Sequence, residues 1–76
     1  MAKAYLKINV VPGKEKIIKG ALTETKGVKE AYITTGDQDI IALVEANNFS
    51  DLLKLVVSKL RVIEGITKTD TNFILE

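Results

Sequence analysis

The spacing of apolar residues alternates between two periods along this 76-residue chain, and that alternation most constrains its fold. A period of two over residues 3–11 predicts a β-strand with one apolar face, formed by Leu6, Ile8 and Val10. Pro12 and Gly13 end this strand, because proline cannot donate to a sheet and glycine permits the bend. Helical spacing begins at Lys14 and predicts a helix whose apolar face comprises Ile17, Ile18, Ala21 and Leu22. We expect Gly27 to end this helix as its C-terminal cap.

Two further strands are predicted in the middle of the chain, over residues 28–35 and 39–46. The short connection at residues 36–38 makes this pair an antiparallel hairpin. The second strand of the hairpin contains the run Ile40-Ile41-Ala42-Leu43-Val44, which is apolar on both faces. Strands of this kind are usually covered on both sides.

The last third of the chain predicts a second helix and a fourth strand. The helix is expected to begin at an N-cap on Asn48 or Ser50 and to end before Gly65. Its apolar stripe comprises Leu52, Leu53, Val56, Leu60 and Ile63. The strand is expected over residues 66–75, and one of its faces carries Thr67, Thr69, Thr71, Phe73 and Leu75.

The predicted order is βαββαβ, an α+β, ferredoxin-like plan with two helices on one face of an antiparallel four-stranded sheet. Residues 1–76 are expected to form a single domain. Two helices leave the other sheet face open, yet the strand at residues 39–46 needs apolar cover there. We expect a second copy to pack sheet against sheet, giving a dimeric α+β sandwich or barrel. The alternative is a monomer that exposes an apolar patch.

Composition and charge narrow the function classes. The chain has 11 Lys and Arg against 10 Asp and Glu, without a block of like sign, whereas nucleic-acid binders concentrate basic residues. We therefore expect no direct DNA binding. The sequence contains no Cys, no signal-peptide pattern and no apolar run of about 18 residues, which predicts a soluble cytoplasmic protein outside the membrane.

The residues needed for most enzyme sites are missing. The sequence contains neither His nor Cys, so nucleophilic triads and zinc sites lose their usual groups. Asp37 and Asp39 alone make a weak site for a hard cation, and no phosphate-binding glycine motif is present. We predict no catalytic residue, no metal and no cofactor. A small enzyme of the dimeric α+β-barrel type is the competing class.

The turn at Thr34-Thr35-Gly36-Asp37-Gln38-Asp39 has two interpretations. In the structural one, Gly36 supplies a positive φ, and the aspartates bond to nearby backbone groups. In the functional one, amide groups around Gly36 receive an α-carboxylate while Asp37 or Asp39 pairs with an α-ammonium. A free amino acid would match both ends. The residues alone leave both interpretations open.

A resemblance favours the second interpretation. The segment from Val28 to Ile41, followed about 25 residues later by a second segment from Gly65, resembles the effector domain of the Lrp/AsnC family, the RAM domain. The family pattern is a strand ending in Thr-Gly or Ser-Gly, then x-x-Asp, a helix, and a glycine before Thr-x-Thr. It is matched in order by Thr35, Gly36, Asp39, Gly65, Thr69 and Thr71. The resemblance covers essentially the whole chain.

The resemblance implies a ligand-responsive domain of transcriptional regulation that dimerises through its sheets and often assembles as four dimers in a ring. Small effectors, commonly amino acids, bind between dimers near the turn. Carried onto this sequence, the effector site comprises Ile33, Thr35, Gly36, Asp37, Asp39, Thr69 and Thr71. Gln38 stands where the family usually has an aromatic residue, which leaves the effector unnamed.

The family's N-terminal helix-turn-helix is missing from these 76 residues, so the resemblance implies a stand-alone effector domain. Its expected partners are further copies of itself or a full-length regulator of the family. A structural adaptor that binds no ligand is the remaining alternative.

Overall fold

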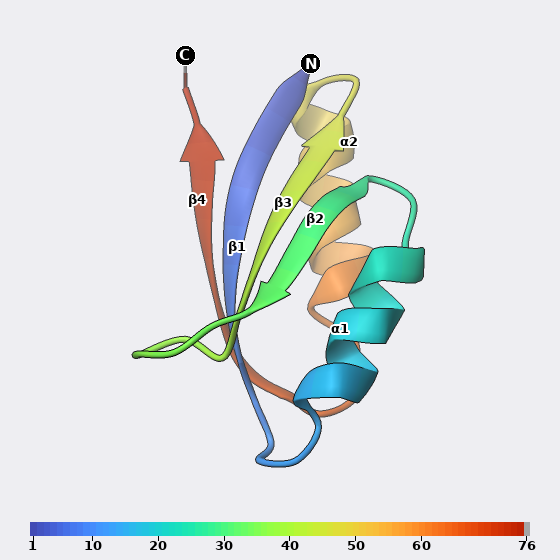
Figure 1. The fold of residues 1–76 in the computed structure, drawn as a ribbon. Coiled ribbons are helices and arrows are strands. Elements are labelled where there is room, and N and C mark those ends of the chain that lie inside the picture. The colour runs from blue at the N-terminus through green and yellow to red at the C-terminus, as the bar shows by residue number, and fades with distance from the viewer. Residues whose placement is uncertain (76) are drawn as a thin grey trace.

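The computed structural model describes residues 1–75 and confirms the predicted βαββαβ order. The four strands form one antiparallel sheet in the order β2-β3-β1-β4, with both helices on one side of it (Figure 1). The elements are β1 (Ala2–Val10), α1 (Glu15–Glu24), β2 (Val28–Ile33), β3 (Ile40–Ala46), α2 (Phe49–Leu55), η1 (Val56–Leu60) and β4 (Ile66–Ile74). This is the ferredoxin-like arrangement.

The core lies between the sheet and the two helices. Alternate residues of β1 and β3 point into it, as expected for strands that are covered on one side. The fully buried large side chains are Leu6, Ile8, Ile18, Leu22, Ile40, Val44, Leu52 and Leu60. They come from both central strands and both helices, so the helices are held by apolar packing on one sheet face.

The prediction for the end of the first helix is wrong. α1 ends at Glu24, and Thr25 already has an extended conformation while its N–H donates to the carbonyl of Leu22 at 3.0 Å. Gly27 adopts a positive φ of 102° at the start of β2, where an added Cβ would lie 2.6 Å from Leu55 Cδ2. Glycine is required here by close packing against α2, and not by a helix cap.

Two apolar side chains predicted for the helix faces are exposed. Ile17 of α1 is 66% exposed and Leu53 of α2 is 43% exposed, whereas Leu55 is buried. The N-cap prediction for the second helix is confirmed at Asn48, whose side-chain oxygen accepts from the Asp51 N–H at 2.8 Å. The regular α-helix then gives way to a π-helical turn at η1. Helical spacing alone fits several adjacent apolar stripes on the second helix. In the structure, the stripe that packs on the sheet is centred on Leu52 and Leu55.

The other face of the sheet is not covered by residues 1–75. Strand pairing places two tyrosines and two aliphatic side chains of neighbouring strands together on it: Tyr5, Tyr32, Ile41 and Leu43. Lys7 and Asp70 are opposite-charge register partners on the same face. As the sequence of β3 predicts, this strand is apolar on both faces.

Candidate functional site

The connection between β2 and β3, which we call the 34–39 loop, is longer than predicted. β2 ends at Ile33 and β3 begins at Ile40. Just before β3, the Asp39 N–H donates to the Ile8 carbonyl of β1 at 2.9 Å. The Thr34 N–H donates to the Asp39 carbonyl at 2.8 Å and closes the base of the loop. The loop projects away from both helices (Figure 1).

Side-chain hydrogen bonds from and to β1 hold the loop in place. Asn9 Nδ2 donates to the Asp37 carbonyl at 2.7 Å, and the Val10 N–H donates to Asp39 Oδ2 at 2.9 Å. Within the loop, Thr34 Oγ1 donates to the Gln38 carbonyl at 2.9 Å. The carboxylate of Asp39 therefore serves a backbone group 29 residues away in sequence, and not a nearby turn amide as the structural interpretation predicted.

The tip of the loop is open to solvent. Gly36 has a φ of 103°, which confirms the predicted positive φ, and an added Cβ would meet no atom of residues 1–75 within 4 Å. Glycine is needed here for its backbone conformation, and not for lack of space. Thr35 and Asp37 are exposed beside it. Among residues 1–75, no hydrogen bond involves the Asp37 carboxylate. It can accept from an incoming ammonium group.

The structure places the two predicted threonines elsewhere. Thr69 pairs with Ile8 and Thr71 pairs with Leu6, so both face the helices. They line a hollow of about 260 Å³ beneath η1, together with Leu53, Val56, Val57, Arg61 and Phe73. The 34–39 loop contacts β1 at the edge that pairs with β3, whereas β4 pairs with the other edge of β1. One chain therefore does not bring these threonines to the loop.

Ile33 also faces the helices, because it pairs with the buried Ile40. It lines a groove of about 500 Å³ beside α1, which we call the α1 groove and whose other residues are Lys16, Lys19, Gly20, Thr23 and Glu24. Of the residues predicted for the effector site, the loop therefore brings together Thr35, Gly36, Asp37 and Asp39.

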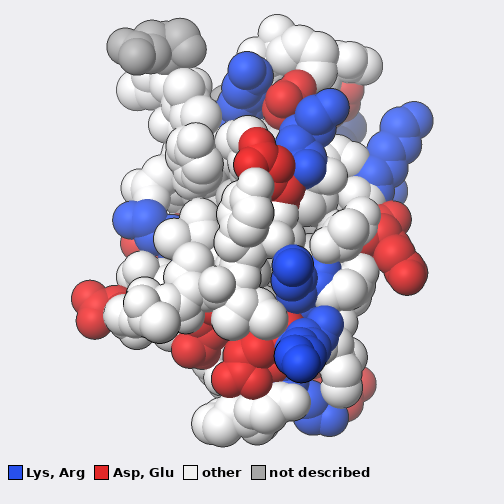
Figure 2. Space-filling model, in the orientation of Figure 1, with Lys and Arg blue, Asp and Glu red and all other residues white. Residues whose placement is uncertain are grey.

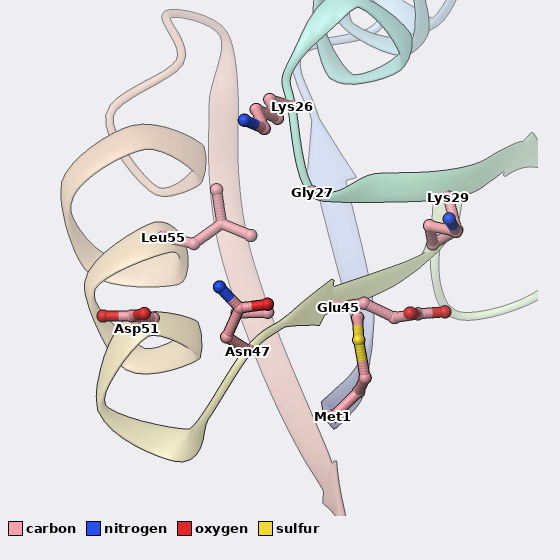
Figure 3. A pocket seen from close by; sticks show the side chains of 9 residues that line it. Met1, Lys26, Gly27, Lys29, Glu45, Asn47, Asp51 and Leu55 are labelled. Carbon is pink, nitrogen blue, oxygen red and sulfur yellow. The ribbon is translucent and has the colours of Figure 1, made fainter.

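Asn9 is a site residue that sequence reasoning missed. Its side-chain amide holds the loop by donating to the Asp37 carbonyl. In the sequence, Asn9 is only a polar position of a strand pattern, and nothing in that pattern indicates the contact. A second feature without a sequence signal is a hollow of about 380 Å³ at the other end of the sheet. It lies between the start of α2 and the strand ends, and Lys26, Asn47, Asp51 and Leu55 are among its lining residues (Figure 3).

Charged side chains of both signs lie on the face of the molecule seen in Figure 2. In the view of Figure 2, basic and acidic side chains are interspersed with uncharged surface. A hydrogen bond from the Tyr32 hydroxyl to Glu30, together with the negative charge of that carboxylate, raises the pKa of Tyr32 on the open sheet face. Along residues 1–75 no group of three or more His, Cys, Asp or Glu could hold a metal ion. No helix in that range is long and apolar enough to span a bilayer.

Comparisons with known proteins agree with this geometry. The Lrp/AsnC ligand binding domain matches residues 3–76. The transcriptional regulator LrpA of Pyrococcus horikoshii is 36% identical over 64 residues, which are 82% of this chain and 45% of LrpA. The chain thus spans less than half of that curated relative.

Solved structures show the same fold. FFRP-DM1 has a TM-score of 0.95 and 31% identity, with 99% of this chain and 100% of that chain covered. A regulator of Neisseria meningitidis, solved as a complex with L-Met, has a TM-score of 0.85 at 14% identity, with 99% of this chain and 50% of that chain covered, and shows likeness of fold alone. The match of the family over nearly the whole chain, on the observed fold, means that this protein belongs to the Lrp/AsnC ligand-binding domain family.

Proposed function

We propose that this domain binds a small effector with an α-ammonium and an α-carboxylate, an amino acid or related metabolite, at the 34–39 loop. The observation that carries the proposal is the state of the loop tip. The tip is exposed and rests on a base held by hydrogen bonds to β1, and it presents the Asp37 carboxylate and the backbone around Gly36. A preorganised tip loses little conformational entropy when a ligand binds.

The effector site is shared between copies of the chain. Asp39 already accepts from Val10, and Ile33, Thr69 and Thr71 face away from the loop within one chain. We therefore assign the first contacts to Thr35, Gly36 and Asp37, and the rest of the site to a neighbouring copy, where Thr69 and Thr71 remain candidates.

The uncovered sheet face supports the assembly half of the proposal. Its tyrosines and aliphatic side chains are apolar surface that a second copy would bury, giving the dimeric sandwich or barrel, and further dimers would close a ring. The effector shifts this assembly by binding one state better than another, since only differential affinity moves an equilibrium. A full-length regulator that carries a DNA-binding domain is the partner through which transcription responds.

Titration calorimetry and sedimentation velocity with the common amino acids test both halves. We expect one or more of them to bind and to change the sedimentation coefficient. Asp37→Asn should weaken that binding at least tenfold, about 1.4 kcal/mol. The control Glu64→Gln removes an exposed carboxylate before β4 and should leave the affinity within about twofold. Absence of heat and of any change in sedimentation with every amino acid would refute effector binding.

Leu43→Glu tests the sheet-face dimer separately. This change places a charge among apolar side chains of the open face while leaving the buried face of β3 intact. We expect the variant to sediment as a monomer at micromolar concentration with unchanged circular dichroism. A wild-type chain that is itself monomeric under these conditions would contradict the dimer.

A further inference from the structure

The outer face of α1 is built unlike an ordinary solvent-facing helix surface. Ile18 and Leu22 point into the core, so at about 100° per residue Gly20 lies at the centre of the opposite side. Around it on the same outer side are Lys16, Ile17, Thr23 and Glu24, all exposed. Ile17 is 66% exposed, and the α1 groove of about 500 Å³ borders Gly20 on the side of Ile33.

No packing contact among residues 1–75 requires a glycine at position 20. An added Cβ at this position would meet no atom within 4 Å, and its φ is not positive, so neither space nor backbone conformation requires glycine. Glycine in a helix interior is less favourable than every other residue except proline. What glycine does offer on an outer face is close approach of another backbone.

The charged residues on this face can pair with the same residues of a second copy. Lys16 stands four residues before Gly20 and Glu24 stands four residues after it. When two identical helices cross in antiparallel orientation at Gly20, residues at equal steps before and after the crossing lie opposite each other. Lys16 of each copy then faces Glu24 of the other, so one two-fold axis satisfies both pairs. A parallel pair would place Lys16 opposite Lys16.

We propose that α1 forms a second two-fold contact, in which it packs antiparallel against α1 of another copy with the two Gly20 residues at the crossing. Ile17 of each copy is buried alongside the partner helix, and the charge pairs flank the crossing. This surface is separate from the sheet face. Two different two-fold contacts on one subunit link sheet-paired dimers into a closed ring, or into a filament if the axes do not close.

The contact also bears on the effector loop. Ile33 lines the α1 groove and is followed directly by the 34–39 loop. A copy that covers the α1 groove would therefore contact Ile33, the residue that directly precedes the loop. The proposal does not depend on effector binding, because its signature is assembly in the absence of any ligand.

A charge exchange tests the antiparallel arrangement. Lys16→Glu and Glu24→Lys each place like charges opposite each other, and each should weaken the assembly of dimers into larger species at least tenfold in sedimentation velocity. The double variant, Lys16→Glu with Glu24→Lys, restores opposite charges and should recover assembly. Single variants that assemble like the wild type, or a double variant weaker than both singles, would overturn the proposal. The sheet-face dimer should persist in all three, which separates this result from that of Leu43→Glu.

Gly20 provides an independent test. Measured at a concentration too low for dimers to assemble further, Gly20→Ala should raise the melting temperature of the domain, because it removes a helix-interior glycine. At higher concentration it should weaken higher assembly. A lower melting temperature would mean that Gly20 serves its own chain, and the proposal would fail. The sequence contains no cysteine, so Gly20→Cys introduces the one thiol and should form a disulfide-linked dimer on mild oxidation. The control Ser58→Cys, on the exposed side of η1, should not. Equal cross-linking of both variants would refute the crossing at Gly20.

Discussion

Removal of the Asp39 side chain should destabilise the whole domain, although the residue lies on a surface loop. Its carboxylate accepts from the Val10 N–H at 2.9 Å in a partly buried bond that ties the loop to β1. A hydrogen bond to a charged group contributes about 1.5–3 kcal/mol, and the partial exposure of this one favours about 2 kcal/mol. For a domain of this size, such a loss lowers the melting temperature by roughly 8–16 °C.

Two variants separate the hydrogen bond from the charge. In Asp39→Asn the amide oxygen can still accept from Val10, so we expect a loss of about 1 kcal/mol or less. In Asp37→Ala the lost carboxylate has no partner in the described chain, and the change should stay within about 0.5 kcal/mol.

Urea unfolding followed by far-ultraviolet circular dichroism measures all three variants, at one protein concentration because assembly contributes to apparent stability. We expect the midpoint to fall most for Asp39→Ala, with an unchanged slope. If Asp39→Ala and Asp37→Ala have the same midpoint, the bond to Val10 does not hold the loop, and the rigid base invoked for effector binding is wrong.

The remaining predictions concern packing and titration. Gly27→Ala should cost about 2–3 kcal/mol in urea unfolding, since a positive φ is combined with a 2.6 Å approach to Leu55 Cδ2, whereas Gly36→Ala adds no clash and should cost about 1–2 kcal/mol. Equal losses of unfolding free energy in Gly27→Ala and Gly36→Ala would show that Leu55 moves aside and that its contact adds no cost. Glu30→Gln should lower the pKa of Tyr32 towards its ordinary value, because the acceptor loses its negative charge. Absorbance titration of the Tyr32 phenol, in a Tyr5→Phe background, measures this pKa. An unchanged pKa in Glu30→Gln would contradict the hydrogen bond.

The architecture was predictable because apolar periodicity changes wherever the element type changes. Leu6 and Ile8 mark a half-covered strand, and the all-apolar run that starts at Ile40 marks the strand with apolar side chains on both faces. The N-cap at Asn48 was equally local, since a side-chain oxygen reaches an amide three residues on. These features depend on neighbours within a few residues, which is what a sequence pattern records.

Features that depend on contacts between distant segments were not predictable. Gly27 was predicted to cap the first helix, yet an added Cβ there would lie 2.6 Å from Leu55 Cδ2, which belongs to another helix. The pattern of β4 placed Thr69 and Thr71 on one face, but it could not say that this face lies under the helices. The bond from Val10 to Asp39 joins residues 29 apart, and no local signal distinguishes that carboxylate from the free one at Asp37.

The two aspartates differ in their hydrogen bonds, and this difference determines where a ligand can be recognised. An ammonium group that competed with Val10 for Asp39 Oδ2 would break the partly buried bond to the Val10 N–H, which opposes binding by about 1–3 kcal/mol. Asp37 carries no such cost, so recognition at the exposed tip leaves the fold undisturbed. A single exposed carboxylate binds an ammonium group only weakly, because solvent screens the charge and both groups remain hydrated. A neighbouring copy that excludes water from the tip within the assembly would strengthen that contact. Effector affinity should therefore fall when Lys16→Glu disrupts assembly, although Lys16 lies outside the loop; an unchanged affinity in that variant would mean that one chain suffices.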